Sequence, residues 1–378
     1  MLNFAVIGYG NRISGIVDKL SESGEARLCA VMDTDLEAAK QKDREKGYEN
    51  VNYYTDAEEM LKSEKLDGVL IGTRCNLHTE YAVLVAKYNL PLFLEKPVST
   101  TEAQLDTLKT ILPTMNEKTV VSFPLRTSAL LLKVKELTDA GKIGSIEHVQ
   151  AYNNVPYGRG YYHKWYREEK ETGGQWLQKA THDLDYITYL LGALKPVRIC
   201  AAKSQRVFGG DEPAGKLCAE CDKTKTCPES PYNVKKNGDR YIIGPYCCFA
   251  KDVTIEDSGS CILEYENGMH VVYTQNFVAR NGAGKRGARL IGFKGTLEFD
   301  WVTSTIHVYR HQENITEEYR INGASGSHFG GDRNLVENFI DVMKGTATSI
   351  APLAEGIFSA HLCLAAKKSS NEHVFVEV

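Results

Sequence analysis

The sequence lacks a long apolar run, because no stretch approaches the roughly twenty consecutive apolar residues that span a bilayer. Its N-terminus leads directly into a short apolar segment, without the basic region, apolar core and cleavage site that make up a secretory signal peptide. We therefore expect a cytoplasmic protein that neither spans nor binds a membrane.

The sequence also lacks an excess of positive charge, internal repeats and low-complexity segments. Its formal net charge is −4, and its 45 Lys and Arg residues are scattered rather than clustered. Domains that bind nucleic acid typically carry a basic patch or stripe, so we expect no nucleic-acid partner. The hydrophobic content of 42% and charged content of 25% are ordinary for a globular protein, and 378 residues are enough for two domains.

The first residues have the pattern of a dinucleotide-binding unit. A short apolar run precedes Gly8 and Gly10, a segment with helical spacing follows, and a second apolar run ends in Asp33. The glycines allow the backbone to approach a pyrophosphate, and the carboxylate accepts hydrogen bonds from ribose hydroxyls. Asp33 favours NAD over NADP, because a 2′-phosphate would face its negative charge. Ile13 stands where a third small residue is usual, so we expect a looser contact between helix and strand there.

Strand and helix patterns alternate after Asp33. One apolar run ends in a loop that carries Thr73, Asn76 and His78, and another ends in Glu95-Lys96-Pro97. The alternation predicts a parallel sheet covered by helices, in which ligands bind at the carboxyl ends of the strands.

These motifs, in this order, resemble those of the Gfo/Idh/MocA family, the relatives of glucose–fructose oxidoreductase and inositol dehydrogenase. The likeness extends over nearly the whole chain and is carried by Gly8-x-Gly10, Asp33, Asn76-x-His78, Glu95-Lys96-Pro97, Arg126, Gly141-x-Ile143-Gly144, Gly173-Gly174, His182 and Gly330-Gly331-Asp332. The resemblance implies an NAD-dependent oxidoreductase that acts on a CH–OH group of a carbohydrate. It also implies a homodimer or homotetramer assembled through the outer face of a second-domain sheet.

The resemblance implies a second domain that begins near Pro124, and the patterns agree, because the regular alternation stops there and strand-like runs follow. We predict an α/β Rossmann dinucleotide-binding domain over residues 1–123. An α+β domain with a large open, mostly antiparallel sheet is predicted over 124–378, with a Cys-rich insertion at about 209–250.

The family likeness and the strand-end positions together define the expected NAD site. Its predicted residues are Gly8, Tyr9, Gly10, Asn11, Arg12, Asp33, Thr73, Asn76, His78, Glu95 and Lys96. In the resembled family the Lys of the Glu-Lys-Pro motif lies beside the nicotinamide and the reacting carbinol. We therefore predict that Lys96 holds or relays the hydroxyl proton, which a Lys can do when its neighbours lower its pKa.

A second catalytic candidate follows the paired glycines. On a predicted helix, Gln178, His182 and Asp185 lie opposite an apolar stripe, and His182 matches the family's catalytic spacing. Dehydrogenases of the family commonly have Asp where this chain has Gln178, and a neutral amide cannot take a proton. Lys96 or His182 must then supply the base, with Asp185 orienting His182.

Residues 157–167 are dense in aromatic and basic side chains. Such groups suit a polyol or an anionic sugar, but they are also enriched where subunits meet, so both interpretations stay open. The predicted substrate-binding residues are Arg126, Tyr162, His163, Trp165, Arg167, Gln178, Lys179 and Asp185.

Four cysteines of the insertion suggest a cross-link. Cys218 and Cys221 form a C-x2-C pair, and Cys227 and Cys247 follow in a loop-rich segment. Four thiolates can form a closed structural zinc site, while free thiols and a disulfide are the alternatives.

The leading functional prediction is hydride transfer from a secondary hydroxyl of a sugar, cyclitol or glycoside to NAD, with Lys96 and His182 in proton transfer. The alternative is an NAD-dependent glycoside hydrolase that works by transient oxidation, elimination, water addition and re-reduction. A cofactor-dependent sensor on the same fold is a third possibility, because fold does not determine function.

Overall fold

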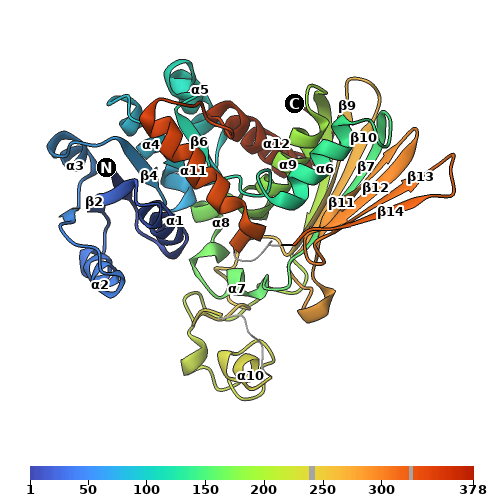
Figure 1. Ribbon diagram of the computed structural model, residues 1–378. Helices are drawn as coiled ribbons and strands as arrows, with labels where there is room; N and C mark the ends of the chain where they lie inside the picture. The colour runs from blue at the N-terminus through green and yellow to red at the C-terminus, as the bar shows by residue number, and fades with distance from the viewer. Residues whose placement is uncertain (238–242, 323–326) are drawn as a thin grey trace. The chain divides into compact units, whose positions relative to one another are not determined.

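The computed structural model describes residues 1–237, 243–322 and 327–378 (Figure 1). The chain forms two compact units, each built from two segments of sequence. Unit 1 comprises Met1–Ala129 and Gly323–His361, and unit 2 comprises Leu130–Asn322 and Leu362–Val378. Residues 238–242 of the predicted insertion lie outside the described residues.

Unit 1 contains a six-stranded parallel sheet with the order β3-β2-β1-β4-β5-β6. Its strands are β1 (Leu2–Ile7), β2 (Ala26–Met32), β3 (Asn52–Tyr54), β4 (Gly68–Ile71), β5 (Leu92–Leu94) and β6 (Thr119–Val121). The chain winds outward from β1 in one direction and then returns to β4 to wind in the other. This reversal creates the switch point at which open α/β sheets bind their ligands, and it confirms the predicted Rossmann fold.

Helices connect these strands and cover the sheet. The helices of the N-terminal segment are α1 (Asn11–Glu22), α2 (Leu36–Lys46), α3 (Ala57–Ser63), η1 (Cys75–Leu77), α4 (His78–Ala86) and α5 (Glu102–Met115). The later segment that returns to unit 1 adds η6 (Ser327–Gly330), α11 (Gly331–Lys344) and the first part of α12 (Leu353–Glu372). Side chains of Asp35, Asp56 and Thr101 accept a backbone N–H at the starts of α2, α3 and α5, as N-caps do. Helix α11 packs against α1, so a distant segment completes unit 1.

The contact between α1 and the sheet is tight at Ile13. This side chain is fully buried, and a Cβ added to Gly72 would lie 2.4 Å from the Cβ of Ile13. Gly72, just after β4, therefore supplies the space that a small residue in α1 would otherwise provide. The expectation of a looser contact was wrong, because the small residue lies on the opposing segment.

Unit 2 contains a nine-stranded sheet with the order β14-β13-β12-β11-β7-β10-β9-β8-β15 (Figure 1). Its strands are β7 (Ile146–Asn154), β8 (Pro196–Ser204), β9 (Ser258–Tyr265), β10 (His270–Asn276), β11 (Lys285–Gly292), β12 (Gly295–Asp300), β13 (Thr305–Arg310), β14 (Thr316–Arg320) and β15 (Val376–Glu377). Strands β7 and β10 pair in parallel, and the other neighbours pair antiparallel. The predicted open, mostly antiparallel sheet is confirmed.

The helical segments of unit 2 are mostly short. They are α6 (Ala129–Asp139), α7 (Arg159–Tyr162), η2 (Trp165–Arg167), α8 (Glu169–Thr172), η3 (Trp176–Ala180), α9 (Thr181–Leu191), η4 (Cys218–Glu220), α10 (Pro231–Lys236) and η5 (Asn281–Ala283). Segment η3 is π-helical, so the α-helical spacing assumed for Gln178 and Lys179 does not hold there.

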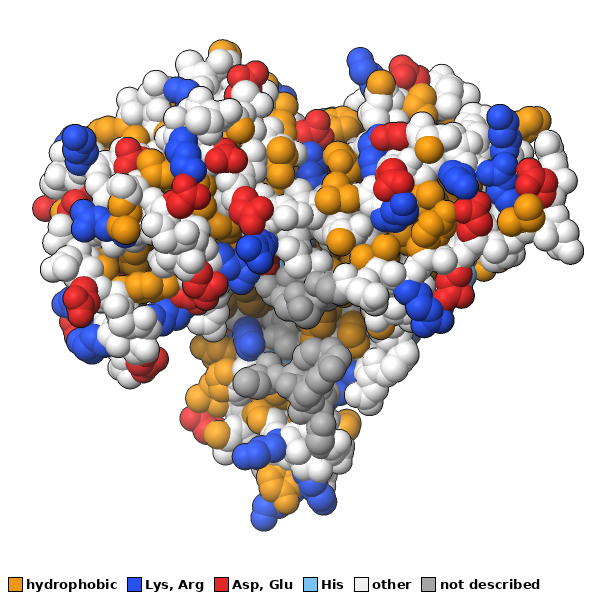
Figure 2. Space-filling model, in the orientation of Figure 1, with side chains coloured by type: hydrophobic (Ala, Val, Ile, Leu, Met, Phe, Trp, Pro, Cys, Tyr) orange, Lys and Arg blue, Asp and Glu red, His pale blue; other side chains and the backbone are white. Residues whose placement is uncertain are grey.

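The described helices include none with both the length and the apolarity needed to cross a membrane. Figure 2 shows basic and acidic side chains interspersed over the visible surface.

An ion cluster with two buried carboxylates joins three segments of unit 1. The Arg12 guanidinium lies 2.9 Å from a Glu95 carboxylate oxygen and 2.7 Å from an oxygen of Asp332, and it donates to the Ser122 hydroxyl at 2.8 Å. The side chains of Glu95 and Asp332 are only 7% and 2% exposed. Because an uncompensated buried charge is costly, each member of the cluster depends on the others.

We expect Asp332→Asn to lower the free energy of unfolding by about 1.5–3 kcal/mol, the usual value of a hydrogen bond to a charged group. Urea unfolding at neutral pH, followed by circular dichroism, measures the change. Asp341→Asn is the matched control on α11, because the Asp341 side chain is 50% exposed; its effect should stay within about 0.5 kcal/mol. Equal effects of the two substitutions would contradict the importance of the cluster.

The difference in unfolding free energy between the wild type and Asp332→Asn should depend on pH. Burial by itself would raise the pKa of Asp332, but hydrogen bonds from His328 and Arg12 and the charge of Arg12 outweigh burial and hold that pKa well below its usual range. A lowered pKa stabilises the fold above the pKa of the unfolded state, about 3.9, and the stabilisation declines as the pH falls below that value. The gap in unfolding free energy between wild type and Asp332→Asn should therefore narrow as the pH falls from about 5 to about 3. A gap that widens over that range would contradict this assignment.

Candidate functional site

The turn after β1 and the loop after β4 meet in unit 1. Gly8 has a positive φ of 80°, and a Cβ at this position would lie 2.6 Å from Thr73 Cγ2 and 2.7 Å from Thr73 Cα. A side chain at Gly8 would therefore clash, which leaves bare backbone at the switch point. Gly10 follows at the start of α1, with Asn11 as the first helical residue, so helix N–H groups point toward this edge as a pyrophosphate requires.

Asp33 lies beside this turn, directly after β2. Its Oδ2 accepts the N–H of Tyr9 at 2.6 Å, and its Oδ1 accepts the N–H of Asp35 at 3.0 Å. Backbone groups thus hold the carboxylate at the sheet edge, where its remaining lone pairs can accept ribose hydroxyls. Lys42 of α2 lies 4.5 Å from the Tyr9 ring centroid and donates to the Tyr9 carbonyl, a contact that the sequence pattern did not reveal.

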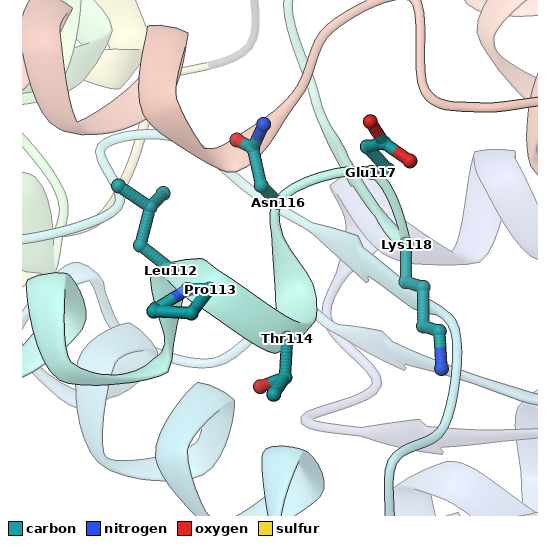
Figure 3. Close-up of a pocket in the computed structure, with 6 residues that line it drawn as sticks. All are labelled: Leu112, Pro113, Thr114, Asn116, Glu117 and Lys118. Carbon is teal, nitrogen blue, oxygen red and sulfur yellow. The ribbon is translucent and has the colours of Figure 1, made fainter.

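A hollow borders the same edge of the sheet. It is lined by residues at the ends of β2 and β3 and on η1, α4 and α5, among them Met32, Thr55, Asn76, Thr79 and Gln104. Its lining includes Met32, the residue before Asp33, and a hollow at this place suits the adenosine half of a dinucleotide. A second hollow, lined by Leu112, Pro113, Thr114, Asn116, Glu117 and Lys118, lies at the end of α5 and before β6 (Figure 3). That hollow is at the amino end of a strand and contains none of the predicted site residues.

Lys96 follows β5 at this edge. It is half-buried, whereas residues 92–95 and 97–100 are buried, and the Lys96–Pro97 peptide is cis. The buried His78 holds the turn, with Nδ1 2.8 Å from the Pro97 carbonyl oxygen and Nε2 3.3 Å from the Thr73 carbonyl oxygen. Burial lowers the pKa of His78, which favours a neutral imidazole. The structure therefore brings Gly8, Thr73, His78 and Lys96 together.

Two predicted residues of unit 1 have charged partners of their own. The guanidinium of Arg12 binds Glu95, Asp332 and Ser122, as described above. Arg126 is 3% exposed, and its guanidinium lies 3.4 Å from both the Ile350 carbonyl oxygen and a Glu355 carboxylate oxygen. Both arginines thus connect the N-terminal segment to the segment that returns to unit 1.

In unit 2, the predicted catalytic His182 is buried rather than on a solvated helix face. His182 is 3% exposed, and Gln178 and Asp185 are 7% and 1% exposed. A helix this deeply buried needs partners for its polar groups.

Asp183 supplies the main attachment of α9 to the sheet. Its Oδ1 accepts Arg286 Nε at 2.8 Å, and its Oδ2 accepts Asn153 Nδ2 at 2.8 Å and the Tyr273 hydroxyl at 2.9 Å. Asn153 pairs in register with both Gln275 and Arg286, so the central strands β10, β7 and β11 present one polar row to α9. Asp183 is fully buried and fixes the backbone next to His182.

The aromatic and basic segment predicted to bind substrate mainly anchors the insertion. Tyr162 is fully buried, stacks on Phe208 at 4.0 Å between ring centroids, and donates to the Glu256 carbonyl at 2.7 Å. His163 Nδ1 lies 2.6 Å from the Tyr246 carbonyl oxygen, and burial lowers the pKa of His163 to about 4.

Arg167 has the same anchoring role. It is 2% exposed, pairs with Asp252, and lies over the Tyr246 ring at 4.3 Å. Trp165 stacks on Tyr166 at 3.9 Å.

Lys179 has a different environment from these anchors. It is 4% exposed, and its Nζ donates to the Tyr157 hydroxyl at 2.5 Å. Tyr157 itself is 37% exposed. The pair therefore places a buried ammonium against the phenol of a residue that is itself partly exposed.

The cysteines of the insertion are free thiols. Backbone hydrogen bonds bring their segments together, with the Cys218 N–H donating to Pro245 and the Cys247 N–H to Lys216, both at 2.8 Å. Burial, reinforced by the neighbouring Cys247, Cys227 and Cys221, raises the pKa of Cys218 to about 11.

The predicted zinc site is not supported. Among the described residues, which include Cys218, Cys221, Cys227 and Cys247, no group of three or more His, Cys, Asp or Glu side chains is arranged to hold a metal ion. The thiols instead have other contacts: the sulfur of Cys218 lies 3.5 Å from the Tyr246 carbonyl oxygen and that of Cys221 lies 3.8 Å from Asp222.

Sequence reasoning did not single out Asp183 or Arg286, and it included Tyr157 only as part of the segment 157–167. Asn153, Gln275 and Arg286 are polar residues in apolar strands, which is a detectable signal. Their meeting depends on strand register, which the sequence pattern did not provide.

Two family models match the chain. The NAD-binding Rossmann fold of an oxidoreductase family matches residues 2–123, and the C-terminal alpha/beta domain of the same family matches residues 135–378. Among curated proteins, YteT of Bacillus subtilis, which is named as an oxidoreductase, is 25% identical over 347 residues, or 79% of this chain and 80% of that protein. The myo-inositol 2-dehydrogenase of Thermotoga maritima is 26% identical over 194 residues, or 50% of this chain and 55% of that protein.

Solved structures show the same fold. A levoglucosan dehydrogenase in complex with NADH and levoglucosan superposes with a TM-score of 0.77 at 17% identity, covering 100% of this chain and 99% of that one. A myo-inositol 2-dehydrogenase from Lactobacillus plantarum gives a TM-score of 0.74 at 17% identity, with the same coverage. Because the two family models together account for nearly the whole sequence, the chain belongs to the Gfo/Idh/MocA oxidoreductase family and carries its NAD-binding Rossmann domain.

Proposed function

We propose that this protein is an NAD-dependent oxidoreductase that oxidises a secondary hydroxyl of a sugar, cyclitol or glycoside. The observation that carries the proposal is the carboxyl edge of the six-stranded sheet, where Gly8, Asp33 and Lys96 follow β1, β2 and β5. NAD, when bound, supplies the acceptor for a hydride. Matches to an inositol dehydrogenase and to a levoglucosan dehydrogenase support a carbohydrate as the substrate class.

The residues of this edge suit the cofactor. The bare backbone at Gly8 and the N–H groups at the start of α1 would receive the pyrophosphate, and Asp33 would accept the ribose hydroxyls. The remaining predicted residues of this set are Tyr9, Gly10, Asn11, Arg12, Thr73, Asn76, His78 and Glu95. Asp33 favours NAD because its carboxylate would repel a 2′-phosphate.

Proton transfer is proposed for Lys96 and His182. When the substrate carbon loses a hydride, its hydroxyl must lose a proton, and Gln178 cannot accept one because an amide is neutral. Lys96 would hold or relay this proton from a turn fixed by His78. His182 would act from α9, whose backbone is fixed by Asp183.

Lys96→Ala should lower kcat by about 10²–10⁴-fold, the usual contribution of a general acid–base group. Affinity for NAD should change much less, because backbone groups and Asp33 carry most of that binding. Purified protein, NAD and a panel of polyols and sugars, followed at the NADH absorbance band, provide the measurement. Lys109→Ala, on a side chain 56% exposed on α5, is the control and should retain wild-type turnover. Full activity in Lys96→Ala would remove the proposed role.

A glycoside hydrolase that uses NAD transiently is the second candidate. The observation that favours it is the neutral, buried Gln178 where dehydrogenases of the family commonly have Asp. In this reaction, oxidation of one hydroxyl acidifies the neighbouring C–H, a base removes that proton and the aglycone leaves. Water then adds to the double bond, and the hydride returns to the sugar.

Net redox change separates the two candidates. With a chromogenic glycoside and NAD, the oxidoreductase should produce NADH in proportion to oxidised sugar and release no aglycone. Aglycone release without accumulating NADH would overturn net oxidation and establish the hydrolytic alternative. Parallel assays of NADH absorbance and free aglycone on the same sample decide between them.

The assembly is also a proposal. We infer a homodimer or homotetramer that uses the outer face of the nine-stranded sheet, where Ile262 and Tyr309 are 42% and 36% exposed. Burial of such apolar groups on association is favourable.

A further inference from the structure

We propose that the substrate carries a carboxylate, as a sugar acid or uronide does, and that Lys179, Tyr157 and Arg286 form its binding site in unit 2. This inference rests on the proposed function, because it names the substrate class of the same reaction. It begins from the most exposed residue of the group, Tyr157, which is 37% exposed and whose hydroxyl accepts a hydrogen bond from Lys179.

The charges of this cluster do not balance. Lys179 and Arg286 are cations that are 4% and 7% exposed, and Asp183 is a fully buried anion that pairs with Arg286. The three side chains together carry one net positive charge. Excess buried charge is unfavourable unless a partner compensates it, so the cluster favours a monoanion.

Among its described residues, this region contains two buried hydrogen-bond donors that have no acceptor. Within the described part of the chain, Nη2 of Arg286 and Nε2 of Gln275 are buried and have no acceptor. Arg286 already uses Nε on Asp183 at 2.8 Å, so its guanidinium retains donor capacity. Buried donors without acceptors are rare in proteins and point to a missing acceptor such as a carboxylate oxygen.

The pKa of the Tyr157 hydroxyl reflects the positive charges around it. Burial by itself would raise the pKa of Tyr157, but the charges of Lys179 and Arg286 and the hydrogen bond from Lys179 outweigh burial and lower that pKa. Negative charge is therefore stabilised at the Tyr157 oxygen. A bound carboxylate would use the same stabilisation, accepting from the Lys179 ammonium and the Tyr157 hydroxyl.

A carboxylate fits better than a phosphate. The net charge of the cluster matches a monoanion, whereas a sugar phosphate carries close to two negative charges at neutral pH. The available donors are one ammonium, one phenol and one edge of a guanidinium, which suit the two oxygens of a planar group.

The first test compares matched ligands on the wild-type protein. The acids glucuronate, galacturonate and gluconate are each compared with a neutral counterpart, namely glucose, galactose and sorbitol. Glucose 6-phosphate tests whether the site prefers a phosphate. Binding is measured by thermal shift and calorimetry with and without NAD, and turnover by NADH formation. We expect the acids to bind, or to show kcat/KM, about 10- to 100-fold better than their neutral partners, as charge-assisted hydrogen bonds allow. Equal or weaker binding of every acid, or tighter binding of the phosphate, would overturn the proposal.

The second test uses variants. Lys179→Met should weaken binding of the acids much more than binding of the neutral sugars and so remove the preference for acids, while Lys179→Arg should restore most of the preference. Lys170→Met, on a side chain 73% exposed on α8, is the control and should retain the preference. If Lys179→Met weakens acids and neutral sugars equally, Lys179 is structural and the proposal fails.

A third measurement needs neither ligand nor turnover. In a near-ultraviolet titration, the wild type should show a tyrosine that ionises before the others, and Tyr157→Phe should lose this step. Lys179→Met should move the step to higher pH, and an unmoved step would overturn the proposed positive site. If sugar acids bind in a way that depends on Lys179 but no NADH forms, the carboxylate site is supported and the proposed oxidation fails. If NADH forms from neutral sugars alone, the proposed oxidation is supported and the carboxylate site fails.

Discussion

All strands of a parallel sheet end at the same edge, and this constraint organises unit 1. The order of the sheet reverses at β1, which places the turn after β1 and the loop after β4 at the switch point where open α/β sheets bind their ligands. Gly8 approaches Thr73 so closely that a Cβ would lie 2.6 Å from its side chain. The same edge receives Asp33 from β2 and Lys96 from β5, so residues far apart in sequence line one edge of the sheet, with β1 and β4 between them.

Polar interactions between neighbouring segments hold this edge of the sheet in place. Arg12 joins α1 to Glu95, which precedes Lys96, and to Asp332 at the start of α11. His78 joins the loop after β4 to the turn after Lys96. In unit 2, Asp183 has a similar function, because it attaches α9 to three central strands and fixes the backbone beside His182. In each unit, a charged side chain that is not itself a candidate reactive group joins the segment of a candidate catalytic residue to a distant part of the fold.

The local parts of this arrangement could be predicted from the sequence, and the long-range parts could not. The glycine turn, Asp33 and the Glu95-Lys96-Pro97 turn each sit at the end of one apolar run, so pattern and strand direction were sufficient to place them. The contacts of Arg12 with Asp332 and of Asp183 with Arg286 depend on tertiary packing and strand register. Tyr162, His163 and Arg167 have side chains that suit either a sugar or a core, and only burial showed that they anchor the insertion. The spacing of Cys218 and Cys221 suited zinc, but spacing does not determine whether four thiols converge.

Family membership establishes an oxidoreductase with an NAD-binding domain, and the proposed chemistry is hydride removal from a carbinol carbon. The most direct test uses a substrate found to support turnover, labelled with deuterium on the carbon to be oxidised, and mass spectrometry of the NADH that forms. The account predicts NADH that is heavier by one deuterium, because the hydride comes from that carbon. NADH without the label, obtained from a fully labelled substrate, would contradict it.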